Sequence, residues 1–460
     1  MTGIPACERK SPIYKDSPRK CPSKKGPRDI RKSEETGMIQ FNALMMVFLA
    51  VFVTVALLRR LLTALNIRHL RNHGHEVPEA LAGEIDGDTL ARMSRYTAES
   101  SKFGSLEGLC DDLITLTILL SGFLPWLSAR ILPWESHFIP SGLMFFGVLF
   151  LISFLLSIPF ALYQTFVIEK KYGFSTVTPS LWVSDLLKNF LISAILLGVL
   201  LSAFLALMHY AERTWWLWAW MVFAAFQLLM LWLYPVVIAP LFNKYEPVRD
   251  ETLKEAVVAL MAKAGLKTEG VYQVDEGRRS RHTNAYFTGI GKTKRIVLYD
   301  TLLNSHSHDE ILAILAHEIG HWKKRHILMQ LAFMEAASLA VFYLIYRLLD
   351  WPLPYRTFGF DQSIPYVGLL LLAALFGPLT FFLTPLGTAA LRKFERDADL
   401  YSYTLTGSTG PLRSALKRLA KDNLANLHPH PLYAWFHYSH PPLTERIMNL
   451  RDMETPQKAS

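Results

Sequence analysis

Two histidines and a glutamate lie close together at His317-Glu318-Ile319-Gly320-His321, which is the pattern H-E-x-x-H. Residues four apart share one face of an α-helix, so the imidazoles of His317 and His321 can bind the same metal ion. Neutral imidazole ligands beside an open coordination position are typical of catalytic Zn²⁺. Glu318 directly follows the first ligand and is placed to act as a general base beside the ion. We therefore predict one zinc site per chain.

The residues around this motif predict a buried helix. Ser307-His308-Asp309-Glu310 has the S-x-x-E pattern of a capping box, which marks a helix N-terminus. Gly320 inside the helix costs about 1 kcal/mol relative to alanine, which indicates that another segment approaches closely. The alternative is a chance His-Glu-His pattern on an ordinary buried helix. Ionisable side chains on such a helix are costly unless they are paired or metal-bound.

A catalytic zinc also needs a third protein ligand. Glu395, in the stretch RKFERDADLYSY, is the best candidate. Asp399 follows it by about one helical turn, where it can accept the second ring N–H of a zinc-bound histidine. Two alternatives remain at this stage. Asp397 is a rival ligand, and the acidic residues could instead form a solvated helix start that the helix dipole favours.

Further candidates lie near the C-terminus, in HYSHPPLTERI. A protonated His440, or Arg446, could stabilise a developing oxyanion if it lies near the metal. The alternative is a packed turn, because two prolines stiffen the chain after His440. His326 lies off the ligand face of the helix, so we expect it at the membrane interface.

The composition favours a membrane protein. The chain has 460 residues, of which 51% are hydrophobic, and its mean hydropathy is +0.21. The formal net charge is +9. In a membrane protein such an excess marks cytoplasmic loops, and the chain has no nucleic-acid-binding motif, so we expect the lipid bilayer and no nucleic acid as partners. Cys7, Cys21 and Cys110 lack metal or redox spacing and are expected to be free thiols.

About seven stretches are long and apolar enough to span a bilayer, which requires about 20 residues each. The predicted spans are residues 39–58, 113–132, 142–165, 186–208, 215–238, 327–349 and 366–390. They divide the chain into a disordered basic tail (1–37), spans one to five (38–242), a catalytic portion with the H-E-x-x-H helix (243–326), spans six and seven (327–390), and a C-terminal catalytic portion with the third ligand (391–460).

The basic residues predict the orientation. Lys and Arg are frequent after the first and third spans and in both long polar stretches, and scarce in the alternate loops. By the positive-inside rule, both catalytic portions face the cytoplasm. In the first portion we expect a helix over 250–264, and strands over 271–275, 284–289 and 294–300. The metal helix is expected to run through Lys323-Lys324-Arg325 into the sixth span.

Several longer stretches carry a resemblance to a known family. They are ALYQTFVIEKKYGFS (161–175), YPVVIAPLFNKYEPV (234–248), HTNAYFTGIGKTKRIVLYDTLL (282–303), LAHEIGHWKKRH (315–326), FERDAD (394–399), WFHYSHPPLTERI (435–447) and, more weakly, LPWLSARI in the second span. From about Met38 to Leu450 the chain resembles the Ste24-type CAAX prenyl proteases, integral-membrane zinc metallopeptidases of the M48 class. Residues 1–37 have no counterpart in that family.

The resemblance implies an α-helical membrane protein whose seven transmembrane helices form a barrel-like chamber, with a small α+β zinc metallopeptidase portion at its cytosolic rim. It implies Glu318 as the catalytic base, His440 and Arg446 at the border of the active site, and as zinc ligands His317, His321 and Glu395. It also implies a substrate-binding strand at Asn284, Ala285 and Tyr286. An extended peptide could add to the exposed edge of such a strand.

We therefore predict a membrane-embedded zinc metalloendopeptidase. It would hydrolyse peptide bonds near the C-terminus of prenylated CAAX-type or membrane-associated proteins, so a peptide or lipidated protein is the expected substrate. A quality-control protease of the HtpX type is an alternative, and a non-catalytic metal-binding scaffold is another, although a scaffold has no need of Glu318. The C-terminal QKAS lacks a dilysine retrieval signal. This favours a bacterial inner membrane over the endoplasmic reticulum.

Overall fold

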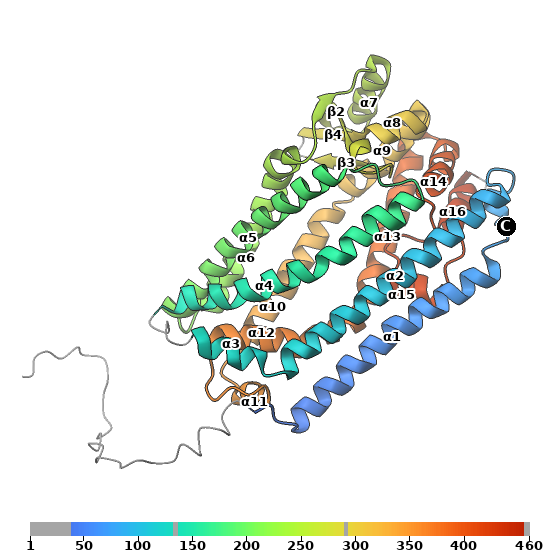
Figure 1. The fold of residues 1–460 in the computed structure, drawn as a ribbon. Coiled ribbons are helices and arrows are strands. Elements are labelled where there is room, and N and C mark those ends of the chain that lie inside the picture. Colours follow the sequence, from blue (N-terminus) through green and yellow to red (C-terminus); the bar gives the residue numbers. More distant parts are fainter. Residues whose placement is uncertain (1–37, 132–136, 289–292, 455–460) are drawn as a thin grey trace, which may run out of the picture.

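The computed structural model describes residues 38–131, 137–288 and 293–454, so the predicted tail at 1–37 lies outside the described residues. Long helices run side by side, and a small α+β portion lies at one end of them (Figure 1). Six described helices are long and apolar enough to cross a membrane, and a bent pair of helices makes a seventh candidate. The expected membrane architecture of about seven spans is confirmed.

The helices of the membrane part are α1 (Ala43–His73), α2 (Gly87–Leu120), α3 (Phe123–Ile131), α4 (Phe138–Tyr163), α5 (Pro179–Tyr210), α6 (Trp215–Leu233), α10 (His326–Leu348), α12 (Pro365–Phe376) and α13 (Thr384–Thr406). Single π-helical segments extend α4 to Glu169 and α6 to Ile238. None of the most apolar window of α6 or of α10 is buried by protein. Most of the surface of these two helices is therefore available to lipid or solvent.

Two predicted spans differ in the structure. The second is not one straight helix, because α2 and α3 meet at an angle of 57°. Gly122 lies at this bend with a φ of +78°, a left-handed conformation that glycine adopts without steric cost. The seventh is interrupted between α12 and α13 by a 3₁₀ segment over Gly377–Leu383, which contains Pro378. Glu395 was expected at the start of a helix after this span, but it lies inside α13.

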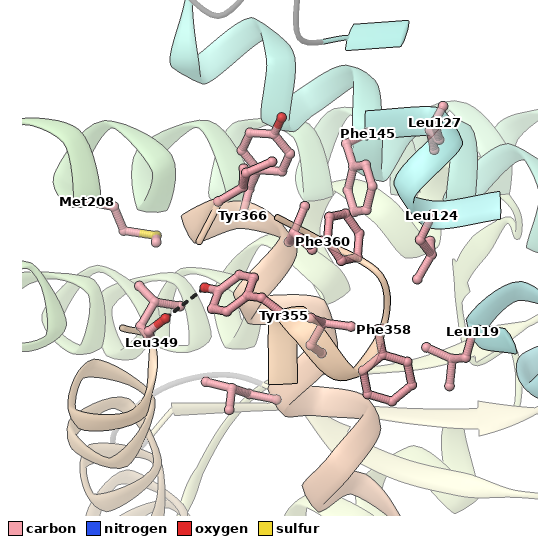
Figure 2. Packing of buried hydrophobic residues seen from close by; sticks show 14 of the residues in the cluster. Leu119, Leu124, Leu127, Phe145, Met208, Leu349, Tyr355, Phe358, Phe360 and Tyr366 are labelled. Carbon is pink, nitrogen blue, oxygen red and sulfur yellow. Dashed lines mark hydrogen bonds between the residues drawn. The ribbon is translucent and has the colours of Figure 1, made fainter. Parts of the chain in front are cut away.

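A hydrophobic cluster packs the end of the helices away from the α+β portion (Figure 2). It joins α3 and α4 to the short helix α11 (Pro352–Thr357) and the loop that follows α11. Phe145 and Phe358 are fully buried there. The Tyr355 hydroxyl, also in the cluster, donates a hydrogen bond of 2.7 Å to the carbonyl oxygen of Leu349. This buried donor is thereby satisfied, as burial of a polar group requires.

The α+β portion contains one mixed sheet of four strands in the order β1-β2-β4-β3. The strands are β1 (Tyr245–Pro247), β2 (Lys267–Val274), β3 (Ala285–Thr288) and β4 (Thr293–Tyr299). The helices are α7 (Glu251–Lys263), α8 (Asp300–Ser305), α9 (His308–Lys323), α14 (Gly410–Asp422), α15 (Pro431–His437) and α16 (Leu443–Glu454). The three predicted strands and the predicted helix are present, whereas β1 was not predicted. β2 and β4 are parallel, and β3 pairs antiparallel with β4.

The sheet packs on the metal helix α9. Ile296 and Leu298 of β4 share a buried hydrophobic cluster with Leu315 and Ile319 of α9. This cluster fixes the position of the H-E-x-x-H face relative to strand β3, since Ala285 belongs to it as well.

Candidate metal centre

Helix α9 begins with the predicted capping box. The Ser307 side chain accepts a hydrogen bond from the backbone N–H of Glu310, and the Glu310 carboxylate accepts one from the backbone N–H of Ser307. Near the other end of α9, a Cβ added to Gly320 would lie 2.9 Å from the Cα of Ala398 in α13. The close approach that this glycine predicted is therefore a packing contact between the two helices that carry the candidate ligands.

The three predicted ligands converge at this contact. The Nε2 atoms of His317 and His321 are 3.2 Å apart. Glu395 Oε2 lies 3.4 Å from His317 Nε2, and Glu395 Oε1 lies 3.3 Å from His321 Nε2. The side chains of His317 and Glu395 are each 7% exposed. Within the described residues, these three form the group of His, Cys, Asp and Glu side chains that can hold a metal ion.

The spacing of these atoms fits a small tetrahedral ion. A tetrahedral site with bonds of about 2.0–2.1 Å places its ligand atoms about 3.3 Å apart. The three measured separations of 3.2, 3.3 and 3.4 Å agree with that value. The partial exposure of His321, 21%, leaves one side of the group accessible. The group can therefore hold an ion and leave a coordination position open.

Asp399 and Arg446 support the first ligand. Asp399 Oδ1 lies 2.8 Å from His317 Nδ1, as the helical spacing predicted. The Arg446 guanidinium donates two hydrogen bonds of 2.7 Å to the Asp399 carboxylate. Burial opposes the charge on Arg446, but its hydrogen bonds to Asp399 and the nearby carboxylates outweigh burial and raise its pKa. Arg446 is thus a permanently charged partner that keeps Asp399 ionised and oriented toward His317.

His326 has a different position from the one predicted. Its side chain is 1% exposed, and its Nδ1 lies 3.0 Å from Nδ1 of His321. The expected continuous helix would have pointed His326 elsewhere, but α9 ends at Lys323 and Arg325 adopts a left-handed conformation with φ of 59°. This break turns His326 back onto the site, where its ring stacks on Phe394 at 4.2 Å. A left-handed conformation is uncommon for arginine, so the sequence did not indicate that His326 would contact His321.

The remaining candidates border the same group. His440 Nδ1 lies 2.8 Å from Glu395 Oε2, and its side chain is 62% exposed. Glu318 is half-buried on α9, close enough for its charge to act on Arg446. Asp397, the rival ligand, points instead toward His326, with 3.9 Å between Asp397 Oδ2 and His326 Nε2. It is not among the converging ligand atoms of the described residues.

The predicted substrate-binding residues begin an edge strand. β3 pairs with β4 on one side, and within the described residues no strand pairs with its other side. Asn284 is exposed just before the strand, and its backbone carbonyl accepts a hydrogen bond from the N–H of Tyr299. Ala285 is buried against α9, while the Tyr286 hydroxyl lies 3.0 Å from that of Tyr245. The free edge of β3 therefore remains available for a further strand.

Comparison with known proteins identifies the family. Residues 66–244 match the family model "CAAX prenyl protease N-terminal, five membrane helices", and residues 247–454 match "Peptidase family M48". CAAX prenyl protease 1 of Saccharomyces cerevisiae is 35% identical over 406 residues, which cover 82% of this chain and 88% of the yeast protein. This chain belongs to the Ste24-type CAAX prenyl protease family.

Other relatives agree with membership in the Ste24-type family. A CAAX prenyl protease 1 homolog of Oryza sativa is 33% identical over 390 residues, covering 82% of this chain and 91% of the rice protein. The crystal structure of S. mikatae Ste24p superposes with a TM-score of 0.82 at 30% identity, over 89% of this chain and 99% of that chain. The protein is therefore a multi-pass membrane metallopeptidase that acts on peptide or protein substrates, and the alternative of a non-catalytic scaffold is set aside.

Proposed function

We propose that this Ste24-type protein is a zinc metalloendopeptidase that cleaves near the C-terminus of prenylated CAAX-type proteins. The observation that carries the proposal is the convergence of His317, His321 and Glu395 within 3.4 Å of one another. Two imidazoles and one carboxylate are a ligand set of catalytic zinc, with one ion per chain. The names of the rice and yeast relatives point to the substrate class.

The chain's own residues then have distinct tasks. When bound, zinc supplies a Lewis acid that polarises a carbonyl and lowers the pKa of water to about 7. The Glu318 carboxylate accepts a proton from the attacking water and delivers it to the nitrogen of the leaving amine. Asp399 accepts the Nδ1–H of His317 and thereby directs Nε2 toward the ion. In the same way, we propose that His326 Nδ1 accepts the Nδ1–H of His321 and orients the Nε2 atom of His321.

His440 and Arg446 differ in what they can reach. Arg446 is buried and hydrogen-bonded to Asp399, so we propose that it positions Asp399 and, through it, His317. His440 keeps an exposed side chain beside Glu395, on the accessible side of the site. We assign to His440 the stabilisation of the negative charge that develops on the substrate carbonyl oxygen.

Strand β3 is the proposed docking site for the substrate backbone. A peptide that adds to its free edge is held by main-chain hydrogen bonds in an extended conformation, the form in which a scissile bond can reach the ion. Asn284 lies at the start of this edge. Its Oδ1 accepts a hydrogen bond from the Ala285 N–H, and its side-chain N–H groups are the donors that we propose for the peptide. The surfaces of α6 and α10 that no protein covers offer apolar contacts for a prenyl group. We also propose that the transmembrane helices enclose the chamber that the family resemblance implies.

We further propose that the metal centre faces the cytoplasm, since basic residues gather on that side of the helices. A reporter fused after Asp300 is expected to be cytoplasmic and one fused after Arg356 external; exchanged signals would reverse the orientation. The bacterial inner membrane remains a prediction from sequence.

The decisive test of the substrate class compares two peptides of one sequence, with and without an S-farnesyl group on the CAAX cysteine. Purified wild-type protein with one equivalent of zinc is expected to release the C-terminal tripeptide from the farnesylated form, with kcat/KM at least tenfold higher, about 1.4 kcal/mol. Equal cleavage of both peptides, together with cleavage of unfolded membrane proteins, would instead support the HtpX-type alternative.

A further inference from the structure

A groove of about 1100 Å³ runs between α2 and the end of α4, outside the metal centre. Its lining includes four basic residues, Arg92, Arg95, Lys102 and Lys171. It also includes the apolar side chains of Phe103, Leu106, Pro159 and Phe160. The proposed peptidase mechanism uses none of these residues.

The lining changes from charged to apolar along the groove. α2 and α4 run in opposite directions past each other (Figure 1). Arg92 and Arg95 lie toward the beginning of α2, and Lys171 follows the end of the α4 span, so all three are near the α+β portion. Phe103 and Leu106 lie farther along α2, and the Phe103 ring stacks on Tyr163 at 4.8 Å. Both walls of the groove therefore become apolar with increasing depth in the membrane.

The groove opens away from the protein interior. Met93 of α2 is 1% exposed and packs in one cluster with Ile168 and Tyr172, which form the buried inner wall of the groove. Lys102 follows Met93 by nine residues, a rotation of about 180° at 3.6 residues per turn. Lys102 is exposed on this opposite side of α2. In the orientation proposed above, this exposed side of α2 faces the bilayer and its cytoplasmic surface.

The charge in the groove is not balanced. Glu99 is the acidic residue in its lining, and its Oε2 accepts hydrogen bonds of 2.6 Å from Lys171 Nζ and 2.8 Å from the Tyr172 hydroxyl. The Arg92 guanidinium donates to the carbonyl oxygen of Tyr172. Arg95 and Lys102 have no ion pair with an acidic residue in the described ranges. Two cations are therefore left on the wall of an apolar groove at the membrane surface.

We propose that this groove binds a phospholipid with an anionic headgroup. The phosphate lies between Arg95 and Lys102, where charge-assisted hydrogen bonds replace those that the two side chains would make to water. An acyl chain lies along Leu106, Phe103 and Phe160. Basic pockets between membrane helices recognise anionic headgroups in this way, by charge at the surface and by apolar contact below it. The inference is independent of the substrate proposed for the metal centre.

Native mass spectrometry of the zinc-loaded full chain tests this site, with dioleoylphosphatidylglycerol and dioleoylphosphatidylcholine added to the micelles in equal amounts. We expect the wild type to retain phosphatidylglycerol about tenfold more than phosphatidylcholine. Arg95→Gln with Lys102→Gln should abolish this preference. Leu106→Trp, which fills the apolar end without changing charge, should reduce retention of both lipids. The matched control is Arg249→Gln with Lys254→Gln, two basic residues at the start of α7 and outside the groove, which should keep the preference.

Cleavage of the reporter peptide in neutral detergent should be unchanged in every variant, which shows that the variants are folded. Equal retention of the two lipids by the wild type would overturn the proposal. So would an unaltered preference in the Arg95/Lys102 double variant. Displacement of phosphatidylglycerol by a farnesylated peptide, with a raised KM in the double variant, would make the groove a substrate site and overturn the assignment to a membrane lipid.

Discussion

The Cα of Ala398 lies 2.9 Å from the position that a Cβ on Gly320 would occupy. Helices α9 and α13 touch backbone to backbone at this point, one residue away from His321 and three away from Glu395. The metal centre therefore depends on the absence of a side chain at residue 320.

We predict that Gly320→Ala separates the two helices and weakens metal binding. Overpacking should lower the free energy of unfolding by about 1–3 kcal/mol, although alanine favours the helix by about 1 kcal/mol. Thermal unfolding in detergent and zinc content provide the measurements. Gly108→Ala in α2 is the matched control, since nothing lies within 4 Å of its added Cβ, and it should be neutral or stabilising. The same behaviour in both variants would contradict the close contact.

Asp399 and Asp397 offer a matched pair for the hydrogen bond behind the ligand. Asp399→Asn removes the charge that receives His317 Nδ1–H and should weaken zinc affinity by about 10- to 100-fold. Asp397→Asn changes a side chain that is 40% exposed and outside the ligand group, so zinc affinity should stay at the wild-type value. Competition with a chelator measures both. A larger loss of zinc affinity in Asp397→Asn than in Asp399→Asn would show that Asp397, and not Asp399, supports the metal centre.

His282 predicts a pH-dependent contribution to stability. Its Nδ1 lies 2.8 Å from Asn423 Oδ1, and its Nε2 lies 3.5 Å from Glu169 Oε2. Burial opposes the charge, but the nearby Glu169 carboxylate and the hydrogen bond to Asn423 outweigh it and raise the pKa of His282. This stabilisation is fully present below the unfolded pKa of about 6.5 and is lost as the pH rises through the raised value. The Tm difference between wild type and His282→Gln should therefore be larger at pH 6 than at pH 9, and a constant difference would refute the charged pair.

Asn284→Ala tests the docking edge. We expect zinc content and folding to be retained while kcat/KM falls by about 10- to 100-fold, or roughly 1.4–2.8 kcal/mol of lost substrate positioning. The assay is cleavage of a farnesylated CAAX peptide at matched zinc content. Asn304→Ala, an exposed asparagine in α8, is the control and should cleave at the wild-type rate. Equal rates for both variants would remove Asn284 from the docking model.

Features with a fixed local geometry could be predicted from the sequence. The four-residue spacing of His317 and His321 requires one helix face, and the capping residues identify where α9 begins. Apolar length predicts the spans because a bilayer has a fixed thickness. The fold is confirmed in these respects, and the structure brings the proposed ligand atoms together.

What the sequence could not show depends on backbone conformation or on tertiary contact. Nothing in the sequence around Arg325 indicates its left-handed backbone conformation. The break before α10 and the contact of His326 with His321 were therefore not predicted. The pairing of Arg446 with Asp399 joins residues that are distant in the chain. Its bidentate geometry is visible only after α13 and α16 have packed.

The Glu318→Gln variant separates the binding of zinc from the transfer of the proton, because Glu318 is proposed as the general base and not as a ligand. Zinc content and peptide cleavage are measured on the same purified wild-type and variant samples. We predict an unchanged zinc content near one per chain and a loss of kcat by about 10²- to 10⁴-fold, the contribution of a general base. Cleavage near the wild-type rate at equal zinc content would contradict it.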